Sequence, residues 1–185
     1  MDITELKVKL EELHSSSFGW ALACCRHAPA EAEEVLQLVY LKILEEKAVY
    51  RGEASFKTWL FAVIRNTAAS ERRKNFLRYL KFHNSDMNAP AMRSNEPWLE
   101  FEKSETQRRF KRALSMLPAR QQEILFLVFY HELSLREAAK VMGISIGSAR
   151  KHYDRGKKRL REILESTEVN YVWRWRRAED PNTLS

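Results

Sequence analysis

The chain has 185 residues and a formal net charge of +7, from 32 Lys and Arg against 25 Asp and Glu. Hydrophobic residues make up 44% of it and charged residues 31%, which excludes a disordered chain and indicates a globular protein. The positive charge favours an anionic partner, such as nucleic acid or a membrane surface. Apolar residues recur three or four positions apart, with only 5 Gly and 5 Pro to interrupt them, so we expect an all-α protein.

The two cysteines, Cys24 and Cys25, are adjacent, so no disulfide within the chain is expected, which suits a reducing compartment. With His27 they form at most half of a metal site. Because four ligands at suitable spacing are missing, small buried residues on a helix explain the pair better. We therefore expect neither a metal nor a cofactor.

Two classes of protein are not expected. The amino terminus lacks a signal-peptide pattern and no apolar run approaches the length of a membrane span, which predicts a cytoplasmic protein without membrane insertion. The five His residues are scattered, no HExxH, Walker or Gly-rich phosphate motif occurs, and no nucleophile lies beside an evident base. The sequence therefore does not indicate an enzyme.

Residues 1–81 are predicted to form a first helical domain. Residues 28–46 are typical of a helix with Pro29 in its first turn, and a break at Gly52 follows. Ser55 is placed to cap a helix from Phe56 to about Phe76. The apolar face of the first helix is expected to contain Val35, Leu38, Val39 and residues 41–44. The inner face of the second is expected to contain Phe56, Leu60, Val63, Ile64 and Thr67.

The outer side of this second helix combines small residues with an amide and cations. It contains Thr58, Ala62, Arg65, Asn66, Ala69 and Arg73, with Trp59 at its edge. Such a surface suits unstacked bases, because rings stack on bases, amides read their edges and cations hold the backbone. For Phe56 and Trp59, packing in the core is an equally good interpretation.

Residues 82–97 are rich in Asn, Ser, Ala and Pro and are predicted to be a flexible linker between two domains. A tail with alternating aromatic and basic residues, 167–185, ends the sequence. Three interpretations of the tail stay open: a strand added to a partner's sheet, a patch on nucleic acid, or a helix end packed on its own domain.

Residues 98–166 are predicted to form a second helical domain. One helix ends at Pro118, and a strongly apolar helix lies within residues 119–133. Ser134 and Glu137 then form a capping box at the start of a short helix. Gly143 supplies the next turn, and the last helix is expected from Ser145 to around residue 165.

On a helical wheel, this last helix has an apolar side and a basic side. The apolar side contains Ile146, Ala149, Tyr153, Gly156 and Leu160. The opposite side contains Gly147, Ser148, Lys151, Arg155 and Lys158, with His152 at its margin. A recognition helix needs this division, because it packs on a scaffold helix while cationic side chains reach into a DNA major groove. A charged face on a purely structural helix is the alternative, which the preceding Ala-Ala pair and Gly turn make less favoured.

Two segments resemble one known family. They are "AEAEEVLQLVYLKIL…YRGEASFKTWLFAVIRNTA" and "LPARQQEILFLVFYHELSLREAAKVMGISIGSARKHYDRGKKRLRE". Together they are similar to bacterial RNA polymerase sigma factors of the sigma-70 family, in the small extracytoplasmic-function (ECF) group. The resemblance implies a sigma-2-like domain and a sigma-4-like helix-turn-helix domain. It implies core RNA polymerase and promoter DNA as partners, and members of this group are typically held inactive by an anti-sigma factor.

The resemblance also assigns roles to residues. For the −10 element it implies contacts by Arg51, Phe56, Trp59, Arg65, Asn66, Arg72 and Arg73, with Arg65 and Asn66 as the leading base readers. For the −35 element it implies contacts by Ser148, Arg150, Lys151, His152 and Arg155, and Lys158 shares their side of the helix. For core polymerase it indicates Glu33, Glu34, Gln37 and Leu38.

Two positions depart from the family pattern. Leu38 stands where the family usually has an acid, and His152 stands where it usually has Arg. Neutral His donates at most one hydrogen bond, so base preference or affinity is expected to differ. The alternative function is a stand-alone helix-turn-helix regulator that binds duplex DNA as a dimer. The first domain favours a sigma factor, because it carries a second surface suited to nucleic acid.

Overall fold

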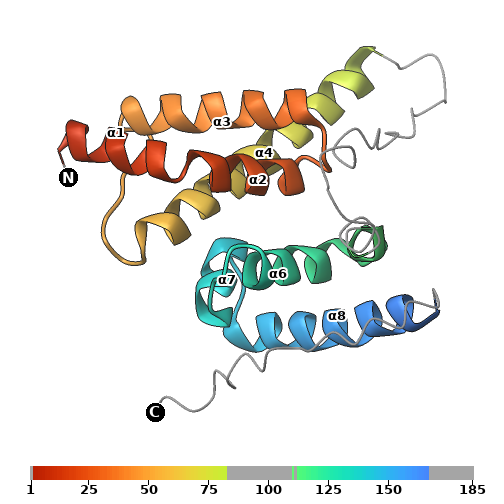
Figure 1. Cartoon of the computed structure of the whole chain (residues 1–185). Coiled ribbons are helices and arrows are strands. Elements are labelled where there is room, and N and C mark those ends of the chain that lie inside the picture. Colours follow the sequence, from red (N-terminus) through yellow and green to blue (C-terminus); the bar gives the residue numbers. More distant parts are fainter. Residues whose placement is uncertain (1, 83–109, 111, 167–185) are drawn as a thin grey trace. The chain divides into compact units, whose positions relative to one another are not determined.

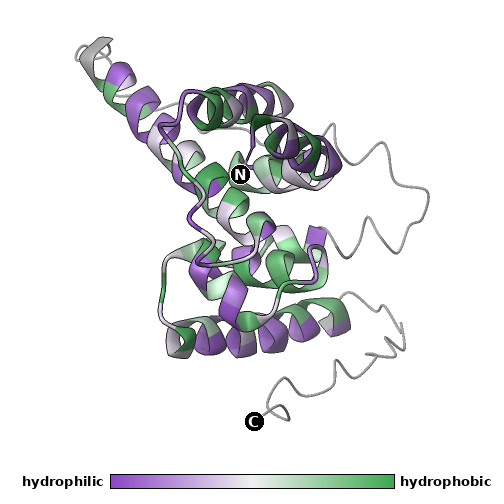
Figure 2. Ribbon diagram, turned by 90° about the vertical axis from the view of Figure 1, so that its left-hand side faces the viewer, coloured by the Kyte–Doolittle hydropathy of each residue, from purple (hydrophilic) through white to green (hydrophobic). Residues whose placement is uncertain are grey.

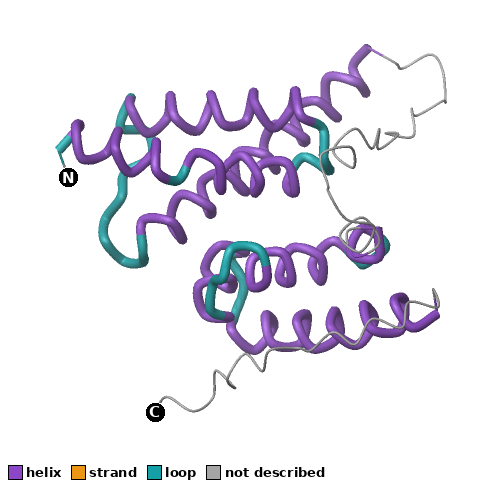
Figure 3. The backbone as a smooth tube through the Cα atoms, in the orientation of Figure 1, coloured by secondary structure: helices purple, strands orange, loops and turns teal. Residues whose placement is uncertain are grey.

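The computed structural model describes residues 2–82, 110 and 112–166, and in this part the chain is helical without a strand (Figures 1 and 3). The prediction of an all-α protein is confirmed. The chain divides into two compact units, the first containing α1 to α4 and the second containing α6, the start of α7, and α8. Most of the predicted linker and the whole predicted tail lie outside the described residues.

The first unit begins with two helices whose bounds were not predicted, α1 (Ile3–Glu12) and α2 (His14–Cys24). Asp2 caps α1 by accepting a hydrogen bond from the Ile3 amide at 2.7 Å. α2 packs against α3 (Pro29–Leu44) and α4 (Phe56–Phe82). At their centre Trp20 is fully buried, stacks on Phe61 and donates its indole N–H to the Phe61 carbonyl at 3.0 Å. This contact satisfies the one polar atom of a large apolar ring.

α4 continues to Phe82, beyond the predicted end near Phe76, and its last turns extend past the helices that cover its first half (Figure 1). Leu60, Ile64 and Thr67 are buried as predicted, and Phe61 and Ala68 join them. Ser55 caps the helix as predicted, accepting a hydrogen bond from the Thr58 amide at 3.2 Å.

The predicted outer position of Thr58 is wrong, because its side chain is only 1% exposed. Its hydroxyl lies 2.8 Å from the Ser55 hydroxyl. A hydroxyl that already has a hydrogen-bond partner can be buried without the penalty of an unpaired polar group. Thr58 is therefore part of the helix cap and core, not of an outer surface.

The second unit contains α6 (Ala119–Phe129), the start of α7 (Leu135–Met142) and α8 (Ile146–Ser166). The predicted capping box is confirmed: the Ser134 amide donates to Glu137 at 3.0 Å, and the Glu137 amide donates to the Ser134 hydroxyl at 3.2 Å. Gly143 makes the turn before α8 with φ +63°, a conformation that favours glycine.

α8 packs closely on α6, and its hydrophilic and hydrophobic sides are visible in Figure 2. The two helices approach closely at Gly156, where an added Cβ would lie 3.1 Å from Leu125 Cδ1 and 3.2 Å from Gln121 Cβ. Ala149 and Leu160 are fully buried on the same side. The predicted inner position of Ile146 is wrong, since this side chain is 39% exposed. A helical side chain usually packs over the turn that precedes it. Ile146 is the first residue of α8, so it has no preceding turn on which to pack.

Candidate nucleic-acid interface

The exposed side of α8 carries the cations that the sequence predicted. Arg150, Lys151, Arg155 and Lys158 are exposed, and Ser148 and His152 are half-buried beside them. The Ser148 hydroxyl lies 3.0 Å from that of Ser145 and therefore contributes to the helix cap. Within the described part of the chain, neither Lys151 nor Arg155 is paired with an acid, so both charges are available to phosphates.

The start of α4 holds a cluster of three half-buried aromatic rings. The ring centroid of Phe56 lies 5.2 Å from that of Trp59, and both lie within 5.4 Å of the Tyr50 ring, which belongs to the preceding loop. Lys9 of α1 places its ammonium 5.9 Å from the Phe56 centroid. Phe56 and Trp59 are half-buried, so part of each side chain is packed and part is accessible to solvent. Arg51, on the loop, is exposed.

Further along α4, Asn66 is exposed and Arg65 is half-buried. Trp59, Asn66 and Arg73 are each seven residues apart, so they share one side of the helix at intervals of about 10 Å. We call Trp59, Ala62, Asn66, Ala69 and Arg73 the α4 face. It offers a ring, an amide and a guanidinium in a row, with small residues between them. This arrangement suits a single strand whose bases are unstacked.

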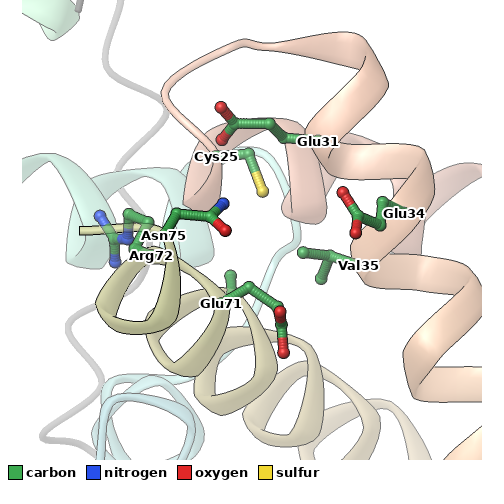
Figure 4. A pocket seen from close by; sticks show the side chains of 8 residues that line it. Cys25, Glu31, Glu34, Val35, Glu71, Arg72 and Asn75 are labelled. Carbon is green, nitrogen blue, oxygen red and sulfur yellow. The ribbon is translucent and has the colours of Figure 1, made fainter. Parts of the chain in front are cut away.

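Arg72 lies elsewhere, in a small cleft between the α2–α3 turn, α3 and α4 (Figure 4). The cleft is lined by Cys25, Glu31, Glu34, Val35, Ala68, Glu71, Arg72 and Asn75. Lys74, two residues after Arg72, is exposed, and its ammonium lies 2.7 Å from the carboxylate of Glu71. The basic run 72–74 therefore divides, with Arg73 on the α4 face and Arg72 beside acidic side chains of α3.

The Cys25 thiol in this cleft is expected to be unreactive in the folded protein. Burial raises its pKa from an ordinary value of 9.0 to about 11, and Glu31 adds to the rise. The thiolate that attacks alkylating reagents is thus scarce at pH 8. We predict that iodoacetamide modifies Cys25 slowly below pH about 10 and rapidly after unfolding, as followed by mass spectrometry with Cys25→Ser as the control. Rapid labelling of the folded protein at pH 8 would contradict this prediction.

Apart from the cleft, α3 has an exposed surface, which we call the α3 face. It consists of Glu33, Glu34, Gln37, Leu41 and Leu44. Glu33, Glu34 and Gln37 are exposed as polar helix residues usually are, and Leu38 is half-buried at the edge. Leu41 is 50% exposed and Leu44 46%, so their predicted place on the buried face is wrong. Val35, Leu36, Val39 and Ile43 already supply the buried side, and one helix side cannot contain both sets.

Tyr50, Leu41 and Leu44 are the residues of these surfaces that sequence reasoning did not select. Leu41 stands four residues after Gln37 and could have been found by that spacing. Tyr50 directly precedes the Arg51–Gly52 turn, but nothing in the pattern indicates which rings it contacts. Among the described residues, no group of three His, Cys, Asp or Glu side chains could hold a metal ion. No helix of the described part is long and apolar enough to span a bilayer.

Comparison with known proteins identifies both units. Residues 11–76 match sigma-70 region 2, and residues 107–160 match sigma-70 region 4, which together make up more than half of the chain. The ECF RNA polymerase sigma factor EcfG of Rhodopseudomonas palustris is 27% identical over 137 residues, 72% of this chain and 71% of the relative. SigX of Bacillus subtilis, another ECF sigma factor, is 27% identical over 138 residues, 73% of this chain and 71% of the relative.

Solved structures show the same fold. The sigma factor RpoE of Bartonella quintana, in complex with the anti-sigma factor NepR, superposes with a TM-score of 0.69 at 24% identity, covering 91% of this chain and 100% of that one. CnrH, in complex with the cytosolic domain of CnrY, gives a TM-score of 0.54 at 16% identity, covering 85% and 86%. With regions 2 and 4 present in the family's order and ECF sigma factors as relatives, this chain belongs to the sigma-70 family of RNA polymerase sigma factors, in its ECF group.

Proposed function

We propose that this sigma factor holds one promoter with two separate surfaces, the α8 cations on −35 duplex and the α4 face on unpaired −10 strand, while the α3 face binds core RNA polymerase. The observation that carries this proposal is the presence of two basic helices in two units that match sigma-70 regions 2 and 4. As a sigma factor, the protein directs core polymerase to promoters. The assignment of residues to each step is our inference.

The proposed −35 contact rests on the geometry of α8. One side of α8, with Ala149, Gly156 and Leu160, is buried against α6. Lys151, Arg155 and Lys158 lie on the opposite, exposed side. Long cationic side chains on one side of a helix can reach both phosphates and base edges in a major groove. Arg150 and the half-buried Ser148 and His152 border this side and complete the proposed contact.

The proposed −10 contact rests on the α4 face and the ring cluster next to it. Extruding a base from the duplex costs a few kcal/mol, which stacking and edge contacts in the protein offset. Phe56 and Trp59 offer rings, Asn66 offers an amide to a base edge, and Arg51, Arg65 and Arg73 offer charge to the backbone. Arg72 would join only through its exposed part, because it also lies in the acidic cleft.

The proposed polymerase contact rests on the α3 face. Leu41 and Leu44, each about half exposed, form an apolar strip bordered by the polar side chains of Glu33, Glu34 and Gln37. An apolar strip with a polar border is typical of a protein interface. Leu38, at the edge of the strip, replaces an acid that the family usually carries. An apolar contact there would take the place of a charged one.

We assign residues 1–81 to the sigma-2-like domain, 82–97 to the linker, 98–166 to the sigma-4-like domain and 167–185 to a tail. The structurally similar sigma factor RpoE is solved with the anti-sigma factor NepR, and we infer an anti-sigma factor as a partner of this chain as well. We place the protein in the cytoplasm, where core polymerase acts, and expect no catalytic activity from the chain alone.

Run-off transcription with purified core polymerase tests the proposal. Core enzyme with this protein is expected to start transcripts at promoters that core enzyme alone ignores, and genome-wide mapping of start sites would define those promoters. A stand-alone regulator would instead bind duplex DNA tightly without polymerase, as a dimer on a palindrome. If core enzyme neither binds the protein nor changes its start sites, the proposal is wrong.

A further inference from the structure

The loop between α3 and α4 is closed by the side chain of Tyr50. The Tyr50 hydroxyl donates a hydrogen bond to the Ala54 carbonyl at 2.6 Å, across the intervening residues Arg51, Gly52 and Glu53. These three residues are exposed, and Gly52 has φ +77°, which favours glycine. One side chain therefore joins the two ends of an exposed loop tip.

The ring of Tyr50 also contacts the first turn of α4. It meets the Phe56 ring edge-on, with centroids 5.3 Å apart and planes at 85°, and lies 5.4 Å from the Trp59 centroid. Edge-to-face contacts at such distances are favourable and have a defined geometry. The hydroxyl thus fixes the loop tip while the ring fixes the two aromatic side chains of α4.

We propose that Tyr50 is a positioning residue for strand capture. It holds Arg51, on the loop tip, and the Phe56 and Trp59 rings, on α4, in one arrangement before DNA arrives. A surface ordered in advance loses less conformational entropy when it binds, so the strand is bound more tightly and with better base discrimination. This inference rests on the proposed capture of the −10 strand by this surface, and it adds a residue that neither the resemblance nor the helical pattern selected.

The variant Tyr50→Phe tests the proposal because it removes the hydroxyl and keeps the ring. The probe is a fluorescent single-stranded oligonucleotide with the −10 non-template sequence of a mapped promoter, titrated with core polymerase carrying the variant. We expect affinity to fall roughly three- to tenfold, the usual effect of losing one hydrogen bond. The preference for the promoter strand over strands with one substituted base should fall as well.

Tyr40→Phe is the matched control. It removes the same group from the same unit, but the Tyr40 hydroxyl bonds His14 Nδ1 at 3.0 Å, between α2 and α3. Strand affinity and base preference should stay at the wild-type level in this variant. For both variants, affinity for core polymerase and the unfolding temperature are measured in parallel.

Each outcome decides the question. Weaker strand binding and reduced base preference in Tyr50→Phe, with core affinity and unfolding temperature unchanged, support positioning. Unchanged strand binding overturns the proposal, and so does a parallel fall in strand affinity, core affinity and unfolding temperature, which marks a purely structural role. If wild-type holoenzyme does not bind the strand, the proposed −10 function itself is wrong.

Discussion

Replacing Asn66 with alanine is expected to lower transcription from cognate promoters by roughly five- to a hundredfold, the effect of losing one two-bonded base contact. Asn66 is exposed on the α4 face, so its removal leaves no cavity in the core. Core polymerase binding should be unchanged, because the proposed polymerase contact is made by the α3 face. Run-off transcription on a mapped promoter and titration of core enzyme measure the two quantities separately.

Asn75→Ala provides the control for this variant. Asn75 is exposed on the same helix, nine residues further on, and therefore lies on the opposite side from the α4 face. Its side-chain oxygen accepts a hydrogen bond from Arg78, so the change removes a comparable amide and one surface contact. Transcription should be close to the wild-type level. A loss of core binding in Asn66→Ala, or an equal loss of transcription in both variants, would exclude the assigned role of Asn66.

Replacing Lys151 and Arg155 together is expected to weaken binding to a −35 duplex at least tenfold and to change its salt dependence. Each phosphate contact contributes about one unit to the slope of log affinity against log salt, because it releases condensed counterions. Lys151→Ala/Arg155→Ala should therefore reduce the slope by roughly two units. Fluorescence titrations of holoenzyme with a −35 duplex at several salt concentrations give this slope directly.

Arg161→Ala shows whether charge alone explains such a loss. Arg161 is exposed on the same helix but lies about 120° around its axis from Arg155. Removing it takes away a like charge without a proposed phosphate contact, so the slope should change by much less than one unit. If Arg161→Ala reduces the slope of log affinity against log salt by about one unit, as much as each change in the double variant, then α8 attracts DNA by charge alone and does not dock in the proposed orientation.

The position of functional side chains along a single helix could be predicted well. Lys151, Arg155 and Lys158 lie together on α8 as their spacing indicated. Ser55 and Ser134 cap the helices that they were expected to cap, and Ser145, expected as the first residue of the last helix, caps it instead. These are local properties. Helical spacing and hydrogen bonds across three residues depend little on the rest of the fold.

Errors arose where burial depends on a neighbouring helix. Leu41 and Leu44 were expected to be buried with Val39, but the contact of α3 with α2 and α4 leaves them exposed. Thr58 was expected on an outer surface, and it is buried in the helix cap. Ile146 was expected inside, and it is exposed at the first position of α8.

By itself, the sequence determined that this is an all-α sigma factor with basic residues gathered on two helices. Helical periodicity and family motifs depend only on the order of residues along the chain. Only the tertiary structure decided which apolar residues of α3 stay exposed and that Tyr50 joins the loop tip to the rings of Phe56 and Trp59. The physical reason is that a residue pattern specifies the sides of a helix, whereas the helices and loops packed against them specify which side water reaches.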